Sequence, residues 1–73
     1  MKKISIYGKN TWPYTTDARE AFSKKGYNVD YHNVADSGNS VNEMLQYSNG
    51  RKVVPVLVEN GNVTIGFGGT WGI

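Results

Sequence analysis

Alternating apolar and polar residues predict two strands in the first half of the chain. Ile4 and Ile6 alternate with polar neighbours, which indicates a first strand of about five residues that ends in a turn. Val29 and Tyr31 alternate with polar residues in the same way, so a second strand is predicted there. Its polar side fits the edge of a sheet, and we interpret His32 as a solvated edge histidine in preference to a catalytic one.

A helical period separates these two strands. Pro13 suits the first turn of a helix, and Lys25 and Gly26 mark its end. The apolar positions between them recur at helical spacing, as Tyr14, Ala18, Ala21 and Phe22. One face of this helix is therefore predicted to be buried.

A second helix is predicted after the loop 35–39. Ser40 and Glu43 have the spacing of a capping box, which indicates a helix N-terminus. Val41, Met44 and Leu45 are expected to point inward, and the helix is expected to end near residues 49–50.

The apolar run 53–58 predicts a buried central strand, although Pro55 has no backbone N–H for a sheet ladder. Two interpretations of Pro55 stay open. In one, it frees the backbone of Val54 to bond an extended ligand, with a cis Val54–Pro55 bond holding that edge. In the other, Pro55 merely ends sheet pairing. Asn60 and Gly61 predict a tight turn into a fourth strand, antiparallel to the third.

Composition limits the range of functions. The 73 residues fit one domain, 1–73, and the absence of cysteine excludes a disulfide framework and a cysteine zinc site. One histidine is too few for a usual protein metal site, so no metal is expected. The net charge of +2 comes from scattered basic residues, which argues against nucleic-acid binding. Neither a signal peptide nor a membrane span is visible, and we expect a monomer in the cytoplasm.

The start of the first helix is the candidate site. A strand, a loop and a proline-started helix place residues 11–15 where helix amides stabilise an anion. A thiolate or selenolate would benefit, but residue 12 is tryptophan. Its indole has no ionisable chalcogen and cannot form a mixed disulfide.

Three segments, together with the order of elements, carry a resemblance that covers nearly the whole chain. They are the loop Trp12-Pro13-Tyr14-Thr15, the strand entry Val53-Val54-Pro55 and the late glycines Gly66-Phe67-Gly68-Gly69-Thr70. This set resembles the glutaredoxin and glutaredoxin-like redoxin family. The resemblance implies an α/β, thioredoxin-like fold of glutaredoxin type, with a four-stranded mixed sheet flanked by two helices. Because the sequence stops at Ile73, the C-terminal helix of that fold is expected to be truncated or missing.

The resemblance also implies a role for each matching position. Residue 12 matches the nucleophile, Thr15 the resolving cysteine or its serine substitute, and Pro13 the proline of the loop. Lys9 matches the basic residue beside the thiolate and the glycine carboxylate of glutathione, the implied co-substrate. Tyr14 would wall the groove and Val54 would pair with the glutathionyl backbone. The γ-glutamyl end would face Gly68, Gly69 and Thr70.

Simpler interpretations accompany these roles. Tyr14 is equally well explained as a core residue, Lys9 as a solvated loop charge, and the glycines as turn formers. No tightly bound cofactor is implied.

Trp12 and Trp71 also match the two selenocysteines of a smaller branch, the bacterial glutaredoxin-like selenoproteins with a selenocysteine-Pro-Tyr-Thr loop. Selenocysteine is encoded by UGA, a codon that another host or a gene translation can turn into tryptophan. We hypothesise that one or both tryptophans replace selenocysteine.

The leading functional hypothesis is a glutaredoxin-like thiol–disulfide oxidoreductase or electron carrier, inactive in this form because its nucleophile is absent. Glutathione, a protein disulfide or a redox partner protein would be its partner. The alternative is a non-catalytic binding module in which Trp12 anchors a thiol peptide or partner protein. Single-stranded nucleic-acid binding ranks last, because no concentrated basic groove is visible.

Overall fold

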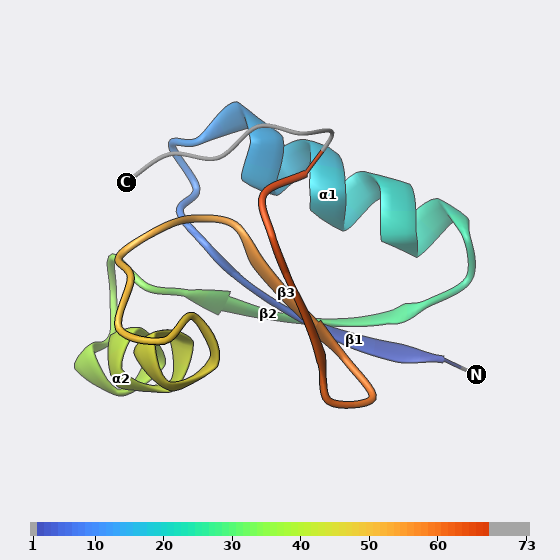
Figure 1. Cartoon of the computed structure of the whole chain (residues 1–73). Helices are drawn as coiled ribbons and strands as arrows, with labels where there is room; N and C mark the ends of the chain where they lie inside the picture. Colours follow the sequence, from blue (N-terminus) through green and yellow to red (C-terminus); the bar gives the residue numbers. More distant parts are fainter. Residues whose placement is uncertain (1, 68–73) are drawn as a thin grey trace.

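The computed structural model describes residues 2–67, in which two helices enclose a four-stranded sheet (Figure 1). The elements along the chain are β1 (Lys3–Gly8), α1 (Pro13–Lys24), β2 (Asn28–Asn33), α2 (Gly38–Tyr47), β3 (Val56–Glu59) and β4 (Asn62–Ile65).

The sheet has the strand order β2-β1-β3-β4. β1 and β2 are parallel, and β3 is antiparallel to both β1 and β4. Asn60 and Gly61 have φ values of 50° and 79°, as the tight turn between β3 and β4 requires. The fold class predicted from the sequence is therefore confirmed, including the edge position of β2 and the internal position of β3.

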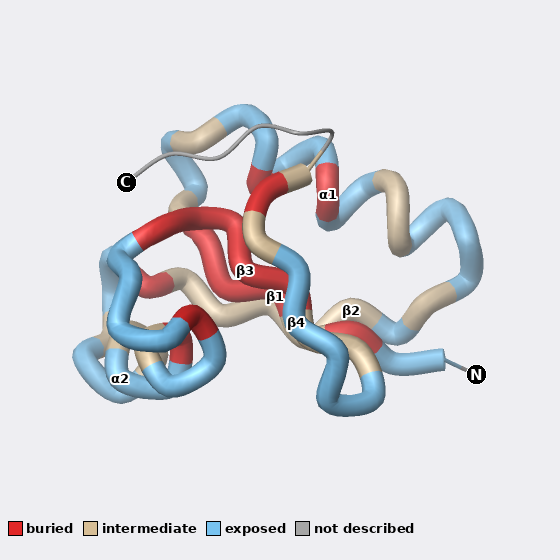
Figure 2. The backbone as a smooth tube through the Cα atoms, in the orientation of Figure 1, coloured by how far each residue is buried: buried red, intermediate tan, exposed pale blue. Residues whose placement is uncertain are grey.

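The core has two layers, one on each face of the sheet. Successive residues of a strand point to opposite faces, so Ile6 and Leu57 pair on the α1 side while Tyr7 and Val56 pair on the α2 side. The buried cluster under α1 consists of Ile4, Ile6, Ala18 and Leu57. The cluster under α2 consists of Tyr7, Val34, Met44, Val53, Val54 and Val56, and Figure 2 shows this burial concentrated along β1 and β3.

Three local predictions were wrong. The N-cap of α2 is Ser37, whose Oγ accepts a hydrogen bond from the Ser40 N–H at 3.3 Å, so the Ser40 capping box does not begin the helix. The predicted loop is correspondingly shorter, because Gly38 already belongs to α2. β3 begins only at Val56, after the proline that cannot join the ladder.

The third error concerns Its ring stacks on Tyr7 at 4.5 Å between centroids, and its Nε2 lies 3.2 Å from the Asp30 carboxylate. Within residues 2–67, none of the helices is long and apolar enough to cross a membrane.

Candidate functional site

The loop between β1 and α1 brings residue 12 to the start of the helix. The Trp12 N–H donates to the carbonyl of Lys9 at 3.1 Å, which closes a turn directly after the strand. The Thr15 N–H donates to the Trp12 carbonyl at 3.0 Å, and Pro13 occupies the first helical position. Residue 12 is therefore the N-cap of α1, where backbone amides favour negative charge.

Trp12 fits this position poorly in polar terms. Its side chain makes no cap hydrogen bond, and its indole Nε1 is buried without an acceptor among the described residues. An unsatisfied buried donor of this kind costs about 1–3 kcal/mol. The ring packs against the core cluster under α2 and lies 5.7 Å from the ring of Tyr14.

Thr15 lies one turn further along α1 and is completely buried. Its Oγ1 has no hydrogen-bond partner in the part of the chain that the structure describes. Its side chain packs directly on Gly8, where an added Cβ would overlap it. Position 15 is therefore tightly enclosed between the helix and the end of β1.

Two exposed residues complete the loop. Pro13 is exposed, and Tyr14 is 38% exposed, so the interpretation of Tyr14 as a core residue is wrong. Its ring leans on the indole of Trp12 at an interplanar angle of 55°.

A cavity of about 280 Å³ lies beside the loop, on the α2 side of the sheet. Its apolar walls belong largely to the same core cluster against which Trp12 packs. The lining residues are Lys9, Val34, Ala35, Val41, Met44, Lys52 and Val54. Two ammonium groups from distant parts of the sequence thus meet at one apolar cavity, which suits a small ligand with carboxylates.

Lys9 was predicted at this site, whereas Lys52 was missed. The only signal for Lys52 in the sequence is its place directly before the segment Val53-Val54-Pro55.

The Val54–Pro55 segment forms the floor of this region. Both residues are buried, the peptide bond between them is cis, and Val54 makes an isolated β-bridge before β3. The Pro55 carbonyl accepts a hydrogen bond from the Gly66 N–H at 2.8 Å. Gly66 has a φ of 90°, a conformation that favours glycine. The predicted contacts at Gly68, Gly69, Thr70 and Trp71 lie outside the described residues.

An aromatic group tied to α2 borders the site. Tyr7 contacts His32 on one side and Tyr47, at 5.8 Å, on the other. Burial, reinforced by the negative charge of Glu43 on α2, raises the pKa of Tyr7 to about 12. Tyr7 therefore stays protonated at neutral pH. Among residues 2–67, no three histidine or acidic side chains gather closely enough to hold a metal ion.

Comparisons with known proteins agree on the family. The family model described as Glutaredoxin matches residues 4–64, so the chain belongs to the glutaredoxin family. The fold is similar to the crystal structure of the glutaredoxin grx-1 from Archaeoglobus fulgidus, with a TM-score of 0.78 at 19% identity. That match covers 92% of this chain and 77% of the archaeal one. No curated protein matches the sequence significantly.

Proposed function

We propose that this protein is a glutaredoxin-like thiol–disulfide oxidoreductase or electron carrier whose nucleophile, a cysteine or selenocysteine at position 12, is replaced by tryptophan in this form. The observation that carries the proposal is the position of residue 12. It caps a proline-started helix beside a cavity with two lysines, yet the indole placed there leaves its N–H buried and unpaired. A chalcogen anion would instead gain from the helix amides.

Glutathione is the co-substrate that fits the cavity. It carries two carboxylates, and the ammonium groups of Lys9 and Lys52 offer two complementary charges at apolar walls. Val54 lines the same cavity and is the position assigned to the backbone of the glutathionyl cysteine. A reducing compartment such as the cytoplasm, where glutathione keeps thiols reduced, fits this role.

The active form would act in two exchange steps. The anion at residue 12 attacks the glutathione sulfur of a protein–glutathione disulfide, and the protein leaves as a thiolate that takes a proton from water. A second glutathione thiolate then attacks the mixed intermediate, which releases glutathione disulfide and restores the anion. Two electrons thus pass from two glutathione molecules to the protein disulfide. Thr15 cannot resolve the intermediate, so the second thiol comes from glutathione, a partner protein or a selenol at position 71.

Restoring the nucleophile tests the proposal. Trp12→Cys is expected to reduce a small mixed disulfide with glutathione at least about 100-fold faster than Trp12→Ser, which has nearly the same size but no thiol. Circular dichroism establishes that both variants are folded. Equal rates for two folded variants would defeat the assignment.

The lysines are tested separately. In the Trp12→Cys background, Lys9→Gln and Lys52→Gln should each raise the apparent KM for glutathione by about fivefold, because each removes one ionic contact. Lys3→Gln, at an exposed residue of β1, is the matched control and should leave KM unchanged.

A non-catalytic binding module is the second candidate. It is favoured by one contact, the 5.7 Å approach of the Trp12 and Tyr14 rings, which would give an aromatic anchor beside the cavity. The two candidates differ in the gene: UGG codons at 12 and 71 support a binding module, whereas UGA supports selenocysteine. The intact mass of the protein from its native host provides the same decision independently.

A further inference from the structure

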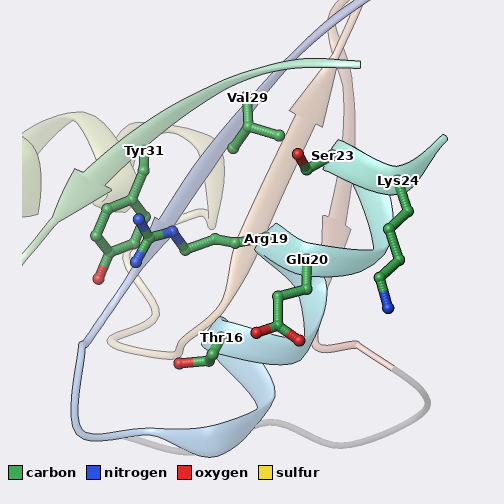
Figure 3. A pocket seen from close by; sticks show the side chains of 7 residues that line it. All are labelled: Thr16, Arg19, Glu20, Ser23, Lys24, Val29 and Tyr31. Carbon is green, nitrogen blue, oxygen red and sulfur yellow. The ribbon is translucent and has the colours of Figure 1, made fainter. Parts of the chain in front are cut away.

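A second hollow lies away from the candidate site, between α1 and β2. It has a volume of about 670 Å³, and Figure 3 shows side chains from both elements around it. Val29 and Tyr31 come from β2, whereas Arg19 and Lys24 come from α1. The wall on the helix side is polar and the wall on the strand side is more apolar.

The backbone of β2 offers unused hydrogen-bonding groups along this hollow. The N–H groups of Asn28 and Val34 donate to β1-side carbonyls, at 2.7 and 3.0 Å. Because backbone groups alternate along a strand, those of Val29 and Tyr31 point away from β1. In the described part of the chain the sheet ends at β2, so these groups face a free edge. The same two residues direct their side chains into the hollow.

Positive charge dominates the helix side of the hollow. The guanidinium of Arg19 stacks on the ring of Tyr31, 3.9 Å from its centroid, and the Tyr31 hydroxyl donates to Asn10 Oδ1 at 2.7 Å. This stacking fixes the plane of Arg19 while leaving its N–H edges available. Within residues 2–67, neither Arg19 nor Lys24 has a carboxylate at ion-pair distance, and Glu20 is the single acidic residue of the lining.

We propose that the β2 edge binds an extended, acidic peptide segment of a partner protein, which adds as a fifth strand and places a carboxylate side chain against Arg19 and Lys24. Main-chain hydrogen bonds to Val29 and Tyr31 supply the docking, and the two cations supply the preference for acidic side chains. The Tyr31–Asn10 hydrogen bond connects this edge to the loop before Trp12, so the bound segment runs toward the candidate site. The binding itself requires no nucleophile at position 12.

A second copy of this chain fits the edge less well. Two β2 strands that pair antiparallel keep the same faces of their sheets together, so the two α1 helices would lie on one side. Arg19 and Lys24 of both copies would then face one another as like charges across the junction. The charge pattern therefore favours an acidic partner.

The test uses a capped peptide of about eight residues in which glutamate alternates with valine, so that an extended chain has one acidic face. Titrated into the ¹⁵N-labelled protein, it is expected to shift the amide signals of Val29, Tyr31 and their neighbours. The matched peptide with glutamine for glutamate should bind about fivefold more weakly. Arg19→Gln should remove this difference, whereas Arg51→Gln should preserve it.

N-methylation of the peptide distinguishes strand addition from general charge attraction. Methyl groups on one alternate set of amides should abolish binding, and methyl groups on the other set should not, because only one set faces β2. The blocking set is the glutamates for an antiparallel segment and the valines for a parallel one. Binding that ignores the methylation pattern, no shifts at β2 with millimolar peptide, or self-association of the protein through β2 would each overturn the proposal.

Discussion

The two helices of this small domain begin in opposite ways. At α2, the side chain of Ser37 caps the first turn through the Ser40 N–H, and the helix is also linked to the sheet through the electrostatic contact of Glu43 with Tyr7. At α1, Trp12 provides no side-chain cap, and two buried polar atoms, on Trp12 and Thr15, have no partner within residues 2–67. Stability explains the first arrangement but not the second, which is the kind of local cost that proteins carry at functional sites.

High pH should break the α2 side of this comparison most strongly. The pKa of Tyr7 is raised from 10.0 to about 12 in the folded state, so its neutral form is favoured there. The unfolded state loses this proton first as pH rises above 10, so the free energy of unfolding is unaffected below pH 10 and falls between about pH 10 and 12. The loss should reach about 2 kcal/mol.

Urea unfolding of the wild type and Tyr7→Phe at a series of pH values measures this effect. The stability difference between the two proteins should shrink over that interval. A constant difference would show that Tyr7 titrates alike in the folded and unfolded states.

Ser37→Ala should have the next largest effect. It removes the oxygen that accepts the Ser40 N–H, and losing a helix cap costs about 1 kcal/mol of stability. Ser23→Ala, at an exposed position within α1, serves as the control and should cost much less. Equal losses in urea unfolding would remove the distinction between a capped and an uncapped start.

Thr15→Val should have the smallest effect, with the opposite sign. It replaces a buried hydroxyl that has no partner by a methyl group of similar shape, so stability should rise by about 0.5–1 kcal/mol. The exposed neighbour Thr16 supplies the control: Thr16→Val should change stability by less than about 0.5 kcal/mol. A destabilised Thr15→Val variant would mean that the hydroxyl has a structural partner.

The sequence predicted the elements best where a local rule acts alone. Asn60 and Gly61 are favoured for their positive φ, and Pro13 begins α1 as a first-turn proline should. It failed where two local signals competed, because Ser37 and Ser40 are both acceptable caps and only the packing of α2 selects Ser37. The chain pattern also could not show that β3 starts after Pro55.

The site was predictable in its loop but not in its cavity. The expectation at Trp12, Pro13 and Thr15 follows from consecutive residues, whereas Lys9 and Lys52 meet only because β1 and the entry to β3 lie side by side. The same limit applies to Arg19 and Tyr31, whose contact depends on how α1 crosses β2. Periodicity identifies faces, but it does not specify which polar side chains of two faces come together.

The thiol pKa of Trp12→Cys tests the central claim most directly, because it measures the preference of the α1 start for an anion without any substrate. Ultraviolet absorbance of the thiolate, followed as a function of pH, gives this value, with Thr16→Cys in the same helix as the comparison. The account predicts a pKa below about 7.5 for Trp12→Cys, lower than that of Thr16→Cys and than the value of about 8.5 for free cysteine. A pKa at or above the free value, in a folded variant, would contradict the claim that this helix start is built for a chalcogen anion.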